Sequence, residues 1–206
     1  DRMALLAPFS PGVALSIISE LCLGLMMLHE SGITHGDISS RTVMIGPDNR
    51  VRLTLGGLWT SFSHSRSAGA VVLLQMAPYM APDITRGEMP SPSSDMYAIG
   101  VLLFELLTGK RPFHGETAMA YGVEHATQPI PSAHELNQGV PVVLDEVLRK
   151  LLAKTKPERY PDVRSLLSEG RIEYEVTDIE SRGTVRISKE GPTGLILSTA
   201  RKIDFE

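Results

Sequence analysis

Cysteine is nearly absent from this chain of 206 residues, because Cys22 is the single example. A disulfide framework is therefore excluded, and a reducing, cytoplasmic setting is expected. A basic excess is also missing, since 20 lysine and arginine residues are outnumbered by 24 aspartate and glutamate residues and the formal net charge is -4. This balance gives no basic surface for nucleic acid or an anionic membrane, so neither partner is expected.

No uninterrupted apolar run is long enough to cross a membrane. The most apolar segment, 15–28, is broken by Ser16, Ser19 and Glu20 and falls short of the roughly 20 residues that a transmembrane helix needs. No charged start followed by an apolar stretch and a cleavage site is visible, so no signal peptide is expected. The chain starts at Asp1 without an initiator methionine, which leaves open what precedes it.

Metal-ligand patterns are lacking as well. The six histidines are scattered along the chain, without an H-x-x-x-H pair and a third ligand. A zinc or iron site is therefore not expected.

Helical signals dominate what the chain does contain. Apolar residues recur at helical spacing, and capping residues or glycines mark several ends. The first expected helix starts at Pro11 after an N-cap at Ser10, carries its apolar residues over 15–28 and stops at Ser31-Gly32. The other expected helices span 95–107, 117–125, 142–154 and 161–168. The helix over 95–107 is apolar on nearly every side, which is typical of a helix in the middle of a domain. Cys22 lies in the first helix and is expected to be a small buried hydrophobe.

Strand signals are confined to two regions. A turn sequence, Gly46-Pro47-Asp48-Asn49, separates short apolar segments at 42–45 and 51–55, which predicts a small hairpin. Residues 59–75 are rich in serine, glycine and alanine and are expected to form a long loop. The tail, 171–206, alternates between apolar and polar residues and is expected to be β-rich, too small to bury much core alone.

Six short motifs follow one another at ordinary spacings: His35-Gly36-Asp37, Leu55-Gly56-Gly57, YMAPD at 79–83, SDMYAIGV at 94–101, LLTGKRPF at 106–113 and KPERY at 156–160. Together they resemble the C-terminal lobe of a protein kinase, in particular of the bacterial eukaryotic-like serine/threonine kinases. The resemblance covers roughly residues 10–170. It implies a mainly α (α+β) fold, with a kinase-like C-lobe over 1–170 that carries the small β-hairpin. The β-rich tail over 171–206 follows, or begins a further domain.

The resemblance also implies structural roles for four residues. Asp95 is expected to accept hydrogen bonds from the backbone of the catalytic loop, and His35 to pack beneath that loop. Asp83 and Arg159 are expected to form a buried ion pair. Because Asp83 replaces the glutamate of the family and is one methylene shorter, the expected pair is longer or bridged by water.

The metal-binding positions of the resemblance have lost their usual residues. In protein kinases Mg²⁺ is held by the aspartate of Asp-Phe-Gly and by an asparagine of the catalytic loop. Leu55 stands at the first position and Thr42 at the second. Mg²⁺ requires oxygen ligands in near-octahedral geometry, and leucine has none. Bound magnesium is therefore not expected.

Other catalytic positions differ too. Ser39 replaces the lysine that faces the γ-phosphate, Gly36 replaces the arginine that receives an activation-loop phosphate, and Met76 replaces a linking threonine. Asp37 alone remains, as a vestigial acceptor for the substrate hydroxyl proton. The alternative for Asp37 is a carboxylate that merely hydrogen-bonds the loop with its neighbours Ser39 and Ser40.

Three functions follow from these residues. The first is a pseudokinase, a catalytically impaired signalling domain that regulates or scaffolds by protein contacts, through the helix at 117–125 and the tail. The second is an active serine/threonine kinase that uses Asp37 as base. The third is a metal-independent nucleotide-binding switch. No G-x-G-x-x-G loop or strand lysine that would cover ATP occurs in the chain, so no cofactor is expected, and ATP only with an N-lobe.

Overall fold

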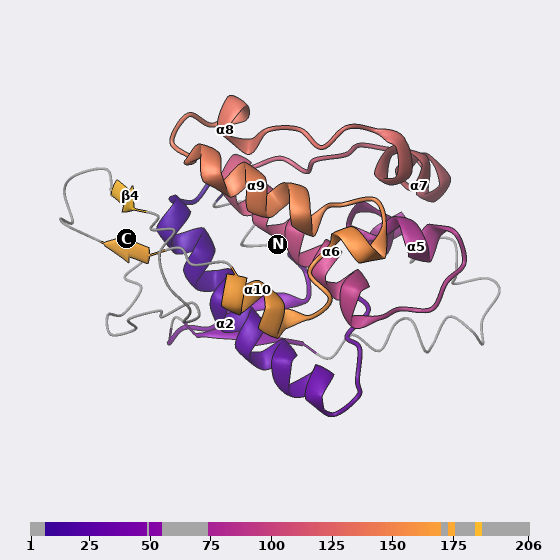
Figure 1. Ribbon diagram of the computed structural model, residues 1–206, viewed down its shortest axis with the longest axis horizontal. Coiled ribbons are helices and arrows are strands. Elements are labelled where there is room, and N and C mark those ends of the chain that lie inside the picture. The colour runs from indigo at the N-terminus through magenta and orange to yellow at the C-terminus, as the bar shows by residue number, and fades with distance from the viewer. Residues whose placement is uncertain (1–6, 49, 55–73, 170–172, 176–183, 187–206) are drawn as a thin grey trace.

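The computed structural model describes residues 7–48, 50–54, 74–169, 173–175 and 184–186 (Figure 1). Helices dominate these ranges, and the strands form two separate antiparallel pairs. In chain order the elements are α2 (Pro11–Glu30), β1 (Val43–Ile45), β2 (Val51–Leu53), η1 (Ala77–Tyr79), α5 (Pro82–Thr85), α6 (Pro92–Thr108), α7 (Ala118–Thr127), α8 (Ala133–Leu136), α9 (Val142–Leu151), η2 (Lys156–Glu158), α10 (Val163–Glu169), β3 (Glu173–Glu175) and β4 (Thr184–Arg186).

Helix α6 is the centre of the domain, as its apolar sequence predicted. It packs between α2 and α9 (Figure 1), and every residue from Ser94 to Leu107 is buried. Its start is fixed by a reciprocal capping box, in which Ser91 and Ser94 each accept a hydrogen bond from the other's backbone N–H. Gly100 allows α9 to approach closely, because a Cβ there would lie 2.8 Å from the Cβ of Leu151.

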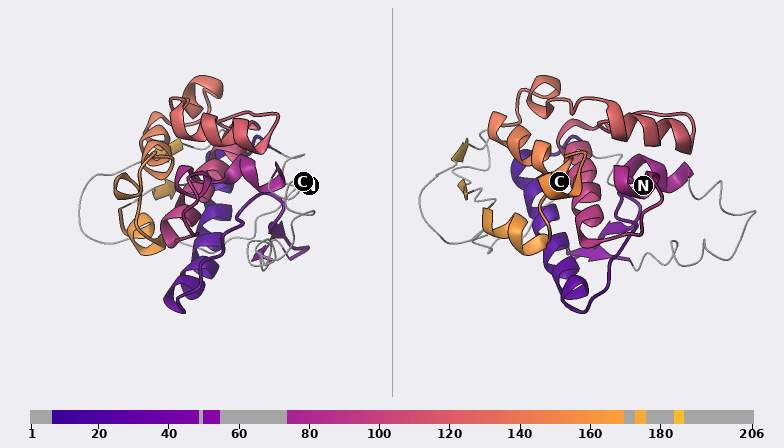
Figure 2. Two further views of the ribbon diagram at one scale, coloured as in Figure 1. Left: turned by 90° about the vertical axis from the view of Figure 1, so that its right-hand side faces the viewer. Right: turned by 45° about the vertical axis from the view of Figure 1, so that its right-hand side comes forward.

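Helix α2 forms the second wall of the core and positions the loop that follows it. Its buried residues include Ile17, Leu21 and Cys22, and α10 packs beside it, as Figure 2 also shows. Ser10 caps the first turn by accepting a hydrogen bond from the N–H of Val13 at 3.5 Å. Cys22 is fully buried, as expected, and burial raises the pKa of its thiol to about 12.

The expectation that no segment is long enough to cross a membrane needs a correction. Helix α2 has 20 residues, more than the 14 residues of 15–28, and it is long and apolar enough to cross a membrane by length and composition. Of its most apolar window, 39% is buried inside the protein. A core helix passes the same test, so the result is weak support for a membrane span.

The predicted hairpin is present. Strands β1 and β2 pair antiparallel with Val43 opposite Leu53, Met44 opposite Arg52 and Ile45 opposite Val51. The hairpin is joined to α2 by a hydrogen bond of 2.9 Å from the N–H of Val51 to Glu20 Oε2. This contact holds strand β2 of the hairpin against α2.

The boundaries of the other helices differ from the sequence expectations by a few residues. Helix α7 begins one residue and ends two residues later than predicted, and α9 ends at Leu151 rather than at 154. The short elements η1, α5, α8 and η2 were not predicted at all. One turn of helix gives too few apolar repeats to produce a periodic signal.

The tail is described only in part. Strands β3 and β4 pair antiparallel, with Tyr174 opposite Val185. The other residues of 171–206 lie outside the described ranges, so the β-rich tail and the domain boundary at 170 stay predictions.

Candidate functional site

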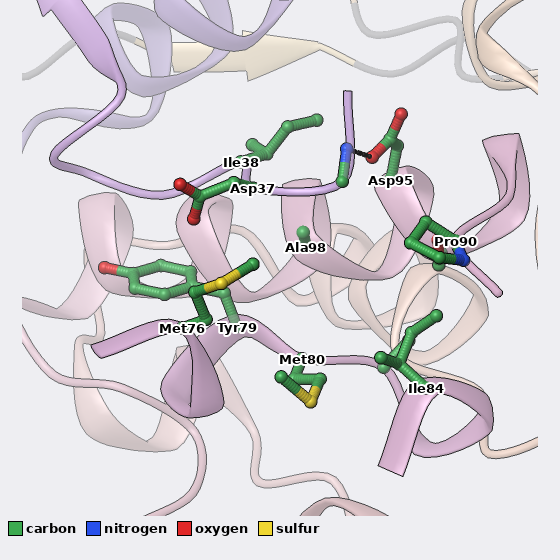
Figure 3. Close-up of a pocket in the computed structure, with 12 residues that line it drawn as sticks. Asp37, Ile38, Met76, Tyr79, Met80, Ile84, Pro90, Asp95 and Ala98 are labelled. Atoms are coloured by element: carbon green, nitrogen blue, oxygen red, sulfur yellow. Dashed lines mark hydrogen bonds between the residues drawn. The ribbon is translucent and has the colours of Figure 1, made fainter. Parts of the chain in front are cut away.

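The candidate site is a pocket between the loop after α2, the segment that contains η1 and α5, and the first turns of α6. Its cavity volume is about 30 Å³, and it opens to solvent. Figure 3 shows Asp37 and Met76 at one end and Ile84 and Pro90 at the other. We call this cavity the Asp37 pocket; its lining residues are Gly36, Asp37, Ile38, Met76, Tyr79, Met80, Ala81, Ile84, Pro90, Ser94, Asp95 and Ala98.

Asp95 anchors the loop from the first turn of α6. Its two carboxylate oxygens accept hydrogen bonds from the backbone N–H groups of His35 and Gly36, both at 2.9 Å. The ring of His29 also contacts Asp95, with Nε2 at 2.8 Å from Oδ2. Charge-assisted bonds to a buried carboxylate are among the stronger ties in a protein. Asp95 therefore fixes the backbone of this loop to the first turn of α6.

His35 lies beneath the loop with both ring nitrogens in use. Its Nε2 is 2.8 Å from the carbonyl oxygen of Thr54, and its Nδ1 accepts a hydrogen bond from the N–H of Asp37 at 3.3 Å. The next residue, Gly36, has a φ of 75°, a conformation that glycine adopts readily and arginine does not. The residue that replaces the family's arginine thus suits the backbone of this loop.

Asp83 and Arg159 form an ion pair that is fully buried on both sides. Arg159 Nη2 donates to Asp83 Oδ1 at 2.6 Å, so the expectation of a longer or water-bridged pair was wrong. Asp83 lies in the first turn of the short helix α5, which brings its carboxylate within direct reach. The same guanidinium donates to the carbonyl oxygens of Ala153 and Ser93, which ties α5, α6 and the end of α9 together.

Thr42 and Ser39 hydrogen-bond to each other rather than facing outward. Thr42 Oγ1 donates to the carbonyl oxygen of Asp37 at 2.6 Å and accepts from the N–H of Ser39 at 3.0 Å. The Ser39 hydroxyl lies 3.3 Å from the same oxygen. A hydroxyl has one hydrogen to donate and two lone pairs to accept with. Thr42 Oγ1 also lies 3.2 Å from the carbonyl oxygen of Ser39, so its hydrogen bonds are made within the loop.

Asp37, unlike Asp83 and Asp95, forms no ion pair with another described residue. It is 5% exposed, and its Oδ2 is buried without a hydrogen-bond partner among the residues that the structure describes. Ser39 is occupied by Thr42, and the hydroxyl of Ser40 bonds instead to that of Tyr79 at 2.9 Å. Burial raises the pKa of Asp37, and the charges of Arg41 and His35 offset part of that rise.

The remaining predicted position in the pocket is Met76. It is buried just before η1 and lines the pocket at the end where Asp37 lies (Figure 3). A thioether is at most a weak hydrogen-bond acceptor, so it cannot make the link that a threonine hydroxyl would make. Leu55, with Gly56 and Gly57, lies outside the described residues. In the described part of the chain, no group of three or more His, Cys, Asp or Glu side chains is placed to share a metal ion.

Sequence reasoning missed two contributors. His29 contacts Asp95 across 66 residues of sequence, and no local pattern marks it. Tyr79 lies in a recognised motif, but its hydroxyl was not given a role. It donates to Glu105 and contacts Ser40, which joins the loop to α6 and η1. Burial and the nearby Glu105 carboxylate raise the pKa of Tyr79 to about 12.

The central helix, the hairpin and the loop anchored by Asp95 define a kinase-like domain. A family model described as "Protein kinase domain" matches residues 3–169, and the chain belongs to this family. It is 34% identical over 163 residues to the probable serine/threonine-protein kinase PknB of Lactococcus lactis. These residues make up 79% of this chain and 26% of that protein.

Two further relatives carry similar names. Serine/threonine-protein kinase PrkC of Bacillus subtilis is 29% identical over 184 residues, which cover 89% of this chain and 28% of PrkC. Serine/threonine-protein kinase PknL of Mycobacterium tuberculosis is 30% identical over 155 residues, 75% of this chain and 39% of PknL. The chain thus spans well under half the length of these relatives.

Proposed function

We propose that this domain is a pseudokinase, a kinase-like module that regulates or scaffolds by contact with other proteins rather than by phosphoryl transfer. The observation that carries the proposal is the hydrogen bonding of Thr42. Its single side-chain oxygen is filled by contacts to Asp37 and Ser39, at the position where the family holds a metal ligand. A neutral hydroxyl that is already engaged in hydrogen bonds within its loop is a poor ligand for Mg²⁺.

Two more positions support the same conclusion. Leu55 offers no oxygen ligand, and Ser39 is neutral where the family carries a cation. Loss of one preorganised charge-stabilising group typically lowers the rate by about 10²–10³. Such losses are strongly non-additive, yet three in one site remove the means of neutralising the transferred phosphate. Asp37 as a proton acceptor does not replace a missing metal.

A contact role is consistent with what the domain has kept. The buried contacts of Asp95 and of the Asp83–Arg159 pair connect the loop and the helices through the protein's own residues. Helix α7 offers an exposed apolar surface. Met119 and Val123 lie one turn apart on it and are 81% and 55% exposed. We propose α7 as the protein-binding surface.

The competing function is an active serine/threonine kinase. The names of the relatives favour it, and so does the presence of Asp37 in the pocket. Such a kinase would need a different arrangement of metal ligands. Metal-independent nucleotide binding is the third outcome that an experiment must separate.

Thermal unfolding of the full-length protein with ATP, with and without Mg²⁺, separates the three functions. A ligand that binds the folded state raises the melting temperature by mass action. The pseudokinase proposal predicts no magnesium-dependent rise. A rise that requires Mg²⁺ would overturn it in favour of a kinase, and a rise with ATP alone would favour the nucleotide switch. A Thr42→Asn variant, which restores a carboxamide oxygen, is the matched control for a gain of metal binding.

A further inference from the structure

The Asp37 pocket contains a buried carboxylate that forms no ion pair among the described residues, although the charges of Arg41 and His35 act on it. Asp37 is 5% exposed, and its Oδ2 has no hydrogen-bond partner in the described ranges. A buried carboxylate without a partner is unfavourable, and native proteins rarely retain one without a reason. Oδ2 is covered from solvent in this structure, so a donor from outside can pair with it only after the carboxylate turns toward the opening of the pocket.

The other polar side chains of the pocket are already satisfied. Asp95 is bound by two backbone N–H groups and by His29. Ser94 donates to Ser91 and accepts from it. The hydroxyl of Tyr79 is shared between Glu105 and Ser40. Asp37 is therefore the group in the described lining that a ligand could engage.

The nearby cations are committed elsewhere. Arg41, the cation closest in sequence, donates to the carbonyl oxygen of Gln75 at 2.9 Å. His35, the other group whose charge acts on Asp37, is engaged through its ring nitrogens with the carbonyl oxygen of Thr54 and the N–H of Asp37. Neither forms an ion pair with Asp37 in the described part of the chain, and burial remains the largest influence on the pKa of its carboxyl. A cationic ligand would supply the missing charge.

The shape of the pocket restricts what can carry that charge. Met76 and the ring of Tyr79 flank Asp37, whereas Met80, Ile84 and Pro90 form an apolar opposite end (Figure 3). A lysine has a flexible apolar stem that can run along such walls and a compact ammonium at its tip. A serine hydroxyl could donate to Asp37 Oδ2 but would leave the buried charge uncompensated. An apolar residue beside the lysine would fill the opposite end.

We propose that the Asp37 pocket binds a lysine side chain from an extended segment of a partner protein. The ammonium pairs with Asp37 Oδ2, and the residue after the lysine packs against Met80 and Ile84. This inference rests on the proposed function, because a working kinase would use Asp37 on a substrate hydroxyl. It gives the pocket a recognition role that requires neither metal nor nucleotide.

Peptide binding to the full-length protein tests the inference, without ATP or Mg²⁺. The probes are three fluorescein-labelled hexapeptides, Ala-Ala-X-Ile-Ala-Ala, in which X is lysine, norleucine or serine. Norleucine matches the lysine stem without its charge. Fluorescence anisotropy is expected to show that the lysine peptide binds about tenfold or more tightly than either of the others, because close charge pairs couple strongly at desolvated sites.

Two variants assign any preference to the pocket. Asp37→Asn keeps the shape and removes the charge, so the lysine preference should vanish. Met76→Lys places an ammonium of this chain at the same end of the pocket and should block the peptide. Met27→Lys, at a position of α2 that is 70% exposed, adds the same charge elsewhere and should bind like the wild type. Circular dichroism of each variant verifies that it is folded.

The inference is overturned if lysine and norleucine peptides bind alike, if serine binds best, if no peptide binds, or if folded Asp37→Asn keeps the preference. Phosphate transfer to the serine peptide, measured separately with Mg²⁺ and ATP, would instead reject the pseudokinase proposal. The two failures are distinguishable, because the first is seen without nucleotide and the second requires it.

Discussion

Two sets of buried carboxylates lie within one domain and differ in how they are satisfied. Asp95, Asp83 and Asp145 are each held by hydrogen bonds or an ion pair, for example by Ser132 and the N–H of Ala133 at Asp145. Asp37 is also buried, and its Oδ2 has no hydrogen-bond partner among the described residues. Asp83 Oδ2 shares this condition but lies 3.7 Å from Lys156 Nζ, whereas no cation of the described residues pairs with Asp37. Asp95 lines the same pocket but is held by hydrogen bonds, so Asp37 is the carboxylate whose presence needs a functional explanation.

Breaking the Asp83–Arg159 pair tests the structural side of this comparison with the largest expected effect. Arg159→Met leaves Asp83 charged and buried, which should lower the free energy of unfolding by about 3–5 kcal/mol. Urea denaturation measures it. The double variant Asp83→Leu, Arg159→Met should recover much of that loss, because it leaves no unpaired charge. A loss below about 1 kcal/mol in the single variant would show that the pair is not a structural tie.

Removing the charge of Asp95 is expected to have the next largest effect. In Asp95→Asn only one side-chain oxygen remains for the N–H groups of His35 and Gly36, so the free energy of unfolding should fall by about 3 kcal/mol. Hydrogen exchange of these two amides should accelerate more than that of the centre of α6. Unchanged exchange at His35 and Gly36 would contradict the anchoring role.

His125 extends the comparison to pH. It is fully buried, its Nδ1 lies 2.8 Å from the hydroxyl of Tyr97, and burial, with help from the charge of Lys154, lowers its pKa to about 4. Between pH 6.5 and 4 the unfolded chain therefore binds the proton more readily, and stability falls as pH decreases. The loss should reach about 2 kcal/mol at pH 5 relative to pH 8. His125→Gln should remove this part of the pH dependence; an equal loss in the variant would assign it to other groups.

Asp37→Asn should have the smallest effect on stability, and of opposite sign. Burial raises the pKa of Asp37, which means that the folded state disfavours the ionised carboxylate present at pH 7. The neutral amide should therefore leave the free energy of unfolding unchanged or raise it by about 1 kcal/mol. Thermal unfolding of Asp37→Asn and of Asp95→Asn under the same conditions compares the stability of the two variants directly. A loss similar to that of Asp95→Asn would place Asp37 among the structural carboxylates.

Features that depend on neighbouring residues could be predicted from the sequence, whereas most contacts between distant residues could not. Helices α2 and α6 have caps and many apolar repeats, and the hairpin has a strong turn, so these elements were found. The Asp83–Arg159 pair was predicted through motifs 76 residues apart, but its direct geometry was not, because it depends on where α5 begins. His29 was missed since nothing near it in the sequence signals a contact with Asp95. The unpartnered oxygen of Asp37 also required coordinates, because burial and the contacts of Ser39 and Thr42 are not sequence properties.

The most direct test of the central claim is transfer of the γ-phosphate from labelled ATP to a serine peptide by the full-length protein with Mg²⁺. If Thr42 and Leu55 no longer support a metal, the wild type should transfer no more than Asp37→Asn. Magnesium-dependent transfer by the wild type that Asp37→Asn abolishes would contradict the pseudokinase assignment.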